Sequence, residues 1–254
     1  MSFNLRDIGC AWAALAALAL AGPAVAQSLS LREHLFGAPS DERAFSTPSV
    51  ARFVPDDGDP FVLDRSAGRQ VFMKFETSPE IWALAPTPGP RGDVIYKNDM
   101  GESVLRATRL GGLTLFTEDR PGGVAVAFVG QGPLLRPPQV ISPNALLQSF
   151  AQASERAARA ARHPVSFEAE GVPMAVASIF ADAATVTAEA FVDIAERGGR
   201  ARQALVRFVK VRFELGHGPD VAAKGDTVKV TIAAERGLAG RPSSHRIAAA
   251  ISDR

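Results

Sequence analysis

Short runs in which apolar and polar residues alternate fill the middle of the chain. Val71, Met73 and Phe75 share one face of such a run and Lys74 lies on the other, which is the two-residue period of a strand. The same period predicts strands over 61–63, 69–75, 93–98, 103–109, 113–117 and 124–129. Turns that contain glycine separate the last four runs, and links this short force neighbouring strands to run antiparallel. We therefore expect a β-meander.

Helical periodicity replaces the alternation after about residue 140. Ser142 followed by Pro143 is a favoured helix start, and Pro164 is expected to stop this helix near His163. One face of the helix carries Leu146, Phe150, Ala153, Ala157 and Ala160. We expect this apolar stripe to pack against the meander sheet.

The rest of the chain mixes both periods. The pattern predicts a short strand over 165–168 and a second helix from residue 182 or 183 to residue 197. Strict alternation over 205–215 and 227–232 predicts two half-exposed antiparallel strands. A short final helix is expected to follow Pro242, because two serines that can cap it come next.

Together these elements indicate an α+β fold: an antiparallel β-meander packed with a long helix, followed by a helix, two antiparallel strands and a short C-terminal helix. We place a single domain at 61–254, mainly β over 61–138 and mixed over 139–254. Residues 27–60 are polar and interrupted by prolines, so we expect a partly ordered lead-in there, with a short helix over 29–35.

Residues 1–26 have the features of a cleavable secretion signal. One arginine precedes an apolar run over 11–21, and Ala24-Val25-Ala26 supplies the small-x-small pattern that a signal peptidase needs. The run is shorter than the roughly 20 residues that cross a bilayer, and Cys10 precedes it, whereas a lipid-attachment cysteine would follow it. We expect cleavage before Gln27, export to the periplasm, and no transmembrane segment after cleavage.

Composition excludes several kinds of chemistry. Cleavage would remove Cys10, the only cysteine among 254 residues, and with it disulfides, thiol nucleophiles and cysteine metal sites. The formal net charge of +1 gives no global field that attracts nucleic acid. The four histidines are scattered singly, and no serine-nucleophile pattern or complete phosphate-binding glycine loop occurs. We therefore expect no nucleic-acid partner, no cofactor and no histidine metal site.

The densest acidic cluster consists of Asp56, Asp57 and Asp59. Several carboxylates around one turn suit calcium, but the spacing lacks the bidentate glutamate of an EF-hand loop. A solvated turn whose aspartates accept local backbone hydrogen bonds is the favoured interpretation. Calcium stays an open alternative.

Two arginines are the candidate binding residues. Arg106 and Arg109 lie on opposite faces of one expected strand, each beside apolar residues. An arginine buried on an apolar face needs an anionic partner, which is either an internal carboxylate or a bound carboxylate or phosphate. Tyr96, on the preceding expected strand, and Trp82 could frame such a ligand. We take Arg106, Arg109 and Tyr96 as the binding site and assign no catalytic or metal-ligating residue.

A second hypothesis rests on carboxylates near the meander turns. Asp93, Asp99, Glu102 and Glu118 all lie there, and two carboxylates facing each other across a cleft can cleave a glycosidic bond. In such a hydrolase Asp93 and Asp99 would be the first suspects.

Three stretches of the meander resemble an uncharacterised exported bacterial family of unknown function. They are Gly92-Asp93-Val94-Ile95-Tyr96-Lys97-Asn98-Asp99, Leu105-Arg106-Ala107-Thr108-Arg109-Leu110-Gly111-Gly112 and Gly122-Gly123-Val124-Ala125. The resemblance extends through the rest of the mature chain and implies a single folded unit. It supplies no activity, ligand or catalytic residue.

The sequence therefore favours an exported, non-catalytic envelope protein that binds a protein partner or an anionic ligand. The export signal and the lack of any nucleophile or metal pattern support this hypothesis. The alternative is a hydrolase that acts on an envelope polymer through paired carboxylates.

Overall fold

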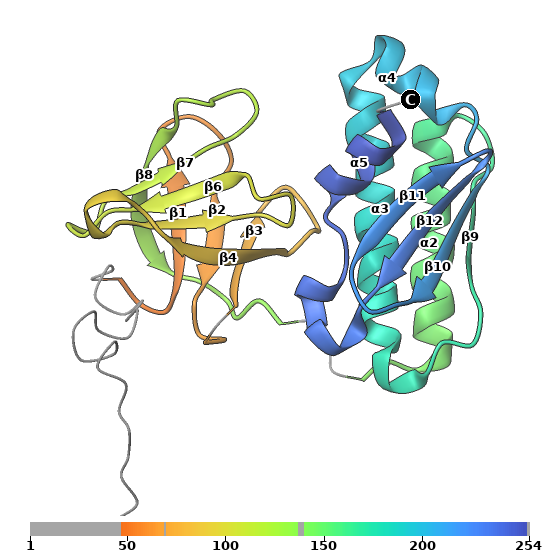
Figure 1. Ribbon diagram of the computed structural model, residues 1–254, viewed down its shortest axis with the longest axis horizontal. Coiled ribbons are helices and arrows are strands. Elements are labelled where there is room, and N and C mark those ends of the chain that lie inside the picture. The colour runs from red at the N-terminus through yellow and green to blue at the C-terminus, as the bar shows by residue number, and fades with distance from the viewer. Residues whose placement is uncertain (1–46, 69, 137–139, 253–254) are drawn as a thin grey trace, which may run out of the picture. The chain divides into compact units, whose positions relative to one another are not determined.

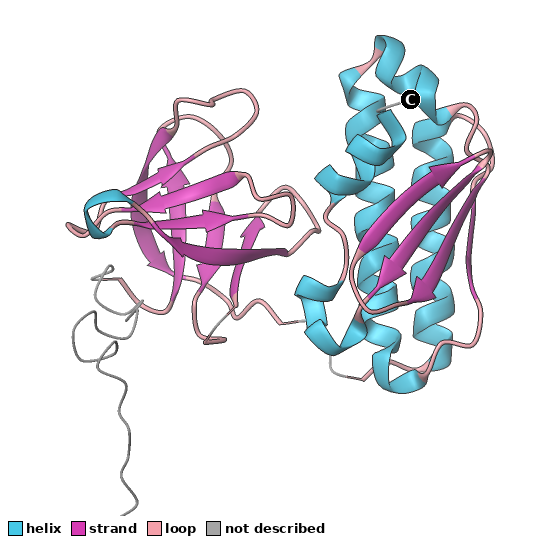
Figure 2. Cartoon of the chain, viewed as in Figure 1, coloured by secondary structure: helices cyan, strands magenta, loops and turns pink. Residues whose placement is uncertain are grey.

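The computed structural model describes residues 47–68, 70–136 and 140–252, and in them a closed β-barrel is followed by a part that mixes helices and strands (Figures 1 and 2). Both parts belong to one compact unit, which spans residues 41–254. The expected secretion signal and the expected helix over 29–35 lie outside the described residues. The α+β class predicted from the sequence is confirmed.

Eight antiparallel strands form the barrel. They are β1 (Val50–Pro55), β2 (Phe61–Asp64), β3 (Val71–Phe75), β4 (Trp82–Pro88), β5 (Val94–Lys97), β6 (Ser103–Ala107), β7 (Leu113–Leu115) and β8 (Val124–Gln131), with a 3₁₀ turn, η2 (Pro90–Gly92), before β5. Each strand pairs with the next, and β1 also pairs with β8. The expected meander is therefore confirmed, and its two ends join.

The inward-facing residues of the alternating strands fill the barrel. Leu63, Met73, Leu105 and Leu115 are 0–1% exposed and belong to one apolar cluster inside it. Tyr96 is fully buried in the same cluster, and it pairs with Leu105 across β5 and β6. Because large side chains occupy the interior, the barrel is a packed core.

Two barrel strands lie in segments where the sequence predicted none. β1 falls within residues 27–60, which we expected to be a partly ordered lead-in, and it hydrogen-bonds to both β2 and β8. β4 contains Pro86 and Pro88 and still pairs with β3 and β5. Prolines normally interrupt strands, so they hid the apolar positions between them, such as the buried Ala51 and Phe53.

The second part consists of α2 (Pro143–Ala161), β9 (Ser166–Ala169), η3 (Met174–Val176), α3 (Ala177–Arg197), α4 (Gly199–Leu205), β10 (Lys210–Leu215), β11 (Asp220–Lys224), β12 (Thr227–Ile232), η4 (Ala234–Gly240) and α5 (Ser244–Ser252). The strands form one sheet in the order β11-β12-β10-β9. Ser142 caps α2 by accepting a hydrogen bond from the Ala145 amide at 3.1 Å, as the sequence predicted.

The pairing of the C-terminal strands corrects the sequence prediction. We expected the strands over 205–215 and 227–232 to be antiparallel, but β10 and β12 are parallel. The cause is β11, which the sequence did not predict. It forms a hairpin with β12 through Gly225, whose φ is 61°, and this reversal brings β12 in beside β10. The alternation is confirmed for Val211, Phe213, Val228, Val230 and Ile232, which are buried, but Val209 and Leu215, which share the apolar face of the expected strand, are exposed.

The long helix α2 does not pack on the meander as expected. Its Ala153, Ala157 and Ala161 belong to the core shared by α3 and the second sheet, whereas the barrel residues form a separate core. A closed barrel leaves no open apolar sheet face for a helix to cover, and small alanines let two helices approach closely.

The central helix of the second part is α3. Residues Met174–Arg197 are long and apolar enough, with a mean hydropathy of 1.5, to cross a membrane by length and composition. However, 61% of the most apolar 18-residue stretch of this segment is buried inside the structure. A helix buried in a protein core can have the same length and composition. Val186, Ala190, Phe191 and Ile194 are buried on the inward face of this helix, which begins at Ala177, before the start that the sequence predicted.

We expect Phe191→Ala to lower the free energy of unfolding by about 3–5 kcal/mol, because it deletes a ring at the centre of the helical core. The exposed Leu147 on α2 provides the control, and Leu147→Ala should change this energy by less than about 0.5 kcal/mol. Urea unfolding followed by circular dichroism measures both. Equal losses in the two variants would contradict the assigned core.

Candidate ligand-binding cleft

A buried arginine joins the barrel to the second part. The Arg241 side chain is 2% exposed, and its Nη1 lies 3.3 Å from Glu80 Oε1 in the loop before β4. Its Nε donates to Asp182 on α3, and its Nη2 donates to the Ile81 carbonyl at 2.7 Å. The Ser244 amide at the start of α5 donates to the same Glu80 oxygen at 3.1 Å. The barrel loop, α3 and α5 are thus held at one point.

Burial perturbs both ends of this cluster. Loss of hydration raises the pKa of Glu80, and Arg241 opposes this effect only in part. Burial alone would lower the pKa of Arg241, but the charges of Asp182 and Glu80 outweigh it and raise that pKa above its ordinary value. A charge buried this deeply is tolerated only when it is paired.

Beside this ionic cluster lies an open cleft, which we call the acidic cleft. It consists of two overlapping hollows of about 900 Å³ and 1110 Å³. Barrel residues from β3, β4 and the β7–β8 turn line one side, and residues of α3 and α5 line the other. Volumes of this order accommodate an organic ligand or a short stretch of peptide.

Aromatic rings line part of the cleft. The Phe75 and Trp82 rings meet edge to face with their centroids 6.3 Å apart. The ring of His245 on α5 also meets Trp82 edge to face, with the two ring centroids 5.2 Å apart. All three residues are partly exposed and line the cleft. Their π faces and edges offer contacts to a flat or cationic group.

Carboxylates dominate the rest of the lining. They are Asp57, Asp59, Glu80, Glu102, Glu118, Asp119, Glu189, Asp193 and Glu196. The three lining arginines are each paired with an acid: Arg106 with Asp93, Arg120 with Asp57, and Arg197 with Glu118. Asp59, Glu102, Asp119, Asp193 and Glu196 form no ion pair among the described residues. The cleft is therefore strongly negative.

The surroundings of Asp193 in the cleft raise the pKa of its carboxyl group. Burial, followed by the negative charges of Glu189, Glu80 and Glu196, raises its pKa from 3.8 to about 7, although Arg197 acts in the opposite direction. From the other elements, Asp59 and Asp119 of the barrel and His245 of α5 also line this region. A carboxyl group that titrates near neutrality inside a cleft is a recognised mark of a functional site.

The structure does not bring the three predicted binding residues together. Arg106 donates to Asp93 Oδ2 from Nε at 2.7 Å, so its anionic partner is internal. Tyr96 lies inside the barrel core, whereas Arg106 pairs with Ile95 across the strands and so belongs to the opposite, outer face. Arg109 is exposed, and its side chain lies close against Gly92. A Cβ added at Gly92 would lie only 2.6 Å from Arg109 Cδ.

The four candidate carboxylates also separate. Asp93 is bound to Arg106, and Asp99 accepts a hydrogen bond from the Ser243 amide at 3.0 Å. Glu102 and Glu118 line the acidic cleft. Asp93 and Asp99 therefore make structural contacts, whereas Glu102 and Glu118 form part of the cleft lining.

The acidic turn at residues 56–59 is held by side chains from other segments of the barrel. Asp57 forms an ion pair with Arg120, and Thr77 donates to Asp59 at 2.8 Å. Within the described part of the chain, no group of three or more His, Cys, Asp and Glu side chains is arranged to hold a metal ion. Both partners are side chains distant in the sequence, so these contacts are not the local backbone hydrogen bonds of the solvated-turn interpretation.

Sequence reasoning did not single out the α3 side of the cleft. Asp182, which binds Arg241, is followed along this mainly apolar helix by the cleft residues Glu189, Asp193 and Glu196, at spacings of 7, 4 and 3 residues. Spacings of three, four and seven place side chains on one helix face. That acidic row was a visible signal, but an acidic row on a helix is more often simply solvated.

Comparison with known families places most of the chain in one group. Residues 30–251 match the family model described as Domain of unknown function (DUF4908), so the chain belongs to this family. Comparison with curated proteins and with solved structures gave no match. The uncharacterised family expected from the meander residues is thus confirmed, and it assigns no role to any residue.

We expect Asp193→Asn to raise the melting temperature at pH 8 and to leave it nearly unchanged near pH 4. The folded pKa of about 7 lies above the ordinary value of 3.8, so ionising Asp193 costs stability as the pH rises through this window, and asparagine avoids that cost. Thermal unfolding over pH 4–8 measures the effect. Asp56→Asn on the exposed turn is the control, and a pH-independent gain in Asp193→Asn would contradict the prediction.

Proposed function

We propose that this chain is an exported, non-catalytic binding protein whose acidic cleft receives a cationic segment of a partner protein. The observation that carries this proposal is the combination of unpaired carboxylates with an aromatic cluster in one cleft. Lysine and arginine side chains have apolar stems and charged heads, so they suit such a lining.

Each part of the lining has a separate task in this proposal. The rings of Phe75 and Trp82 contact the stem or face of the incoming side chain, which adds a cation–π attraction. Asp193 and Glu196 on α3, together with Asp119 on the barrel, attract its charge from two sides. The same lining repels an anionic ligand.

Proton release from Asp193 would tune the affinity. The pKa of Asp193 is raised to about 7, so its carboxyl group is mostly neutral at pH 6 and mostly ionised at pH 8. A cation bound beside it favours the ionised form and pulls that pKa down. Binding of a cationic segment should therefore strengthen as the pH rises through 7.

Hexalysine and hexaglutamate peptides test the proposal. A chain that starts at Gln27 contains Trp82 as its only tryptophan, so its fluorescence reports on the cleft directly. We expect hexalysine to change this fluorescence and hexaglutamate to leave it unchanged. Asp193→Asn combined with Glu196→Gln should weaken hexalysine binding by about tenfold or more.

The matched control removes the same charge elsewhere. Asp56→Asn combined with Glu155→Gln alters an exposed turn and an exposed position of α2, and it should change the hexalysine affinity by less than about twofold. Equal weakening in both double variants, or equal binding of the two peptides, would reject the cleft as a cation site.

A hydrolase remains the second candidate, because one observation favours it. A carboxyl group whose pKa is about 7 can donate a proton to a leaving group at neutral pH, and other carboxylates in the cleft could act as the base. Release of reducing ends from a cell-wall glycan by the wild-type chain, lost in Asp193→Asn, would favour this hydrolase over the binding protein.

Export is a separate part of the proposal and rests on the residues at 1–26. We expect expression of the full chain in a bacterial host to yield a periplasmic protein whose N-terminal residue is Gln27, because Ala24 and Ala26 fit the peptidase groove. Intact-mass measurement of the periplasmic fraction checks this. Ala24→Arg combined with Ala26→Arg should block processing, and an unprocessed wild-type chain in the cytosol would contradict it.

A further inference from the structure

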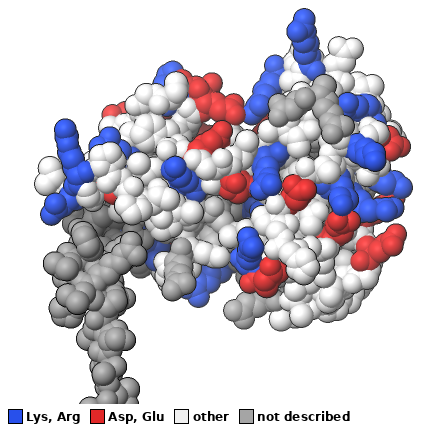
Figure 3. Space-filling model, in the orientation of Figure 1, with Lys and Arg blue, Asp and Glu red and all other residues white. Residues whose placement is uncertain are grey.

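One face of the second sheet is basic and uncovered. Helices α2 and α3 pack on its inner face through one apolar core, and the outer face is open over a hollow of about 500 Å³. Figure 3 shows many Lys and Arg side chains over this part of the surface, with Asp and Glu side chains among them. Strands β9, β10 and β12 are mutually parallel, and sheets with parallel strands are usually covered on both faces.

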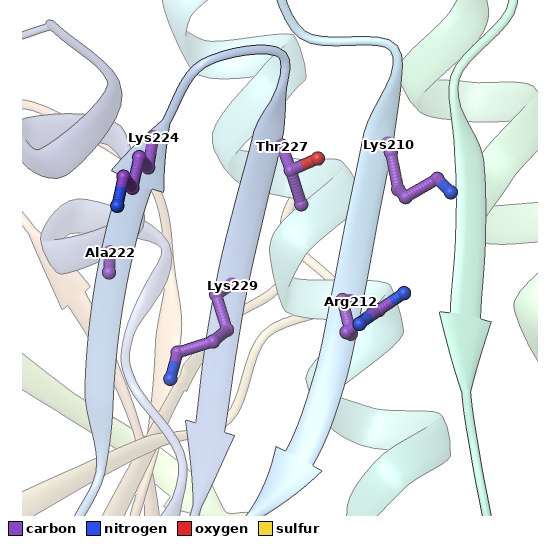
Figure 4. Close-up of a pocket in the computed structure, with 6 residues that line it drawn as sticks. All are labelled: Lys210, Arg212, Ala222, Lys224, Thr227 and Lys229. Atoms are coloured by element: carbon purple, nitrogen blue, oxygen red, sulfur yellow. The ribbon is translucent and has the colours of Figure 1, made fainter.

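Strand register arranges the cations in two neighbouring rows. In one row Lys210 of β10 stands beside Thr227 of β12, which stands beside Lys224 of β11. In the next row Arg212 stands beside Lys229. The close-up in Figure 4 shows all four cations on three adjacent strands, with Lys210 and Arg212 of β10 leaning toward β9, Lys229 of β12 leaning toward β11, and Lys224 on β11 itself. Adjacent strands lie about 4.8 Å apart, so the four charges form one patch, which we call the basic face.

Only half of this charge is neutralised by the protein. Lys210 lies 3.3 Å from Glu168, and Lys229 lies 2.8 Å from Glu214. Arg212 and Lys224 form no hydrogen bond or ion pair with any described residue. Two cations on an open concave surface are thus available to an anion.

The chemistry of the basic face narrows the kind of partner. Its other positions are hydroxylated or small, because Thr227 stands between Lys210 and Lys224, and Ala222 stands beside Lys229. Protein interfaces have an apolar or aromatic centre, and single-stranded nucleic acids need aromatic rings on which bases stack. The basic face offers neither, so it fits an anion recognised by charge alone.

We propose that the basic face binds a linear phosphate polymer. The four cations are spread over three strands, so they match several charges in a row better than one compact anion. The concave surface also suits a chain better than a flat bilayer. This site shares no residue with the acidic cleft, and it is independent of the function proposed for that cleft.

Inorganic polyphosphate carrying a terminal fluorophore is the probe. We expect it to bind the chain that starts at Gln27 and to bind more weakly as salt rises, because counterions are released on binding. Arg212→Ala combined with Lys224→Ala should lower its affinity by about tenfold. Fluorescence anisotropy at low and moderate salt measures these changes.

A control variant removes the same two kinds of charge elsewhere. Lys74→Ala on β3 combined with Arg200→Ala on α4 should change the affinity by less than about twofold. Absence of polyphosphate binding, or an equal loss in both double variants, would overturn the proposal. Tighter binding of the wild-type chain to phosphatidylglycerol vesicles than to polyphosphate would also overturn it in favour of a membrane.

A footprint keeps the test informative if the double variant fails to fold. Lysine acetylation followed by mass spectrometry on the wild-type chain should show that polyphosphate protects Lys224 and Lys229 and leaves Lys74 and Lys97 unprotected. Uniform protection, or protection of the barrel lysines alone, would place the polymer elsewhere and reject the basic face.

Discussion

The buried contact of Arg241 with Glu80 and Asp182 fixes how the barrel loop, α3 and α5 meet. Removing one member of such a buried set costs about 3–5 kcal/mol, because it leaves an uncompensated charge. Apolar packing could join the same elements with a similar free energy, but it would allow several angles between them. A guanidinium with directed hydrogen bonds allows few. The acidic cleft depends on this geometry, since its two sides belong to the elements that Arg241 holds.

The parts of the fold that sequence could predict are those with local causes. Alternation gave most barrel strands, and Ser142 with Pro143 gave the start of α2. The missed strands have non-local causes, because β4 tolerates its prolines and β11 is defined by its pairing with β12. The cleft was equally hidden, since it joins side chains more than 100 residues apart, such as Trp82 and Asp193. The burial of Arg241 could not be predicted either. Arginine is rarely buried without an anionic partner, and the partners Glu80 and Asp182 are distant from Arg241 in the sequence.

Charge on this protein is segregated by surface. A formal net charge of +1 conceals a negative cleft and a positive sheet face whose lining residues do not overlap. Averages over the chain or over its halves cannot detect such a division, because the acids of the cleft come from both the barrel and α3. Local fields decide what approaches each surface, whereas net charge describes only long-range behaviour.

Closure of the barrel between β1 and β8 has a further consequence for the architecture of the chain. Ala51 pairs with Gln131, so the polypeptide enters and leaves the barrel at neighbouring points. A folded unit whose ends meet can be inserted, exchanged or reshaped during evolution without displacing the segments on either side of it. The barrel therefore closes on itself between two neighbouring points of the chain, and its loop is tied to α3 and α5 by the buried Arg241 contacts.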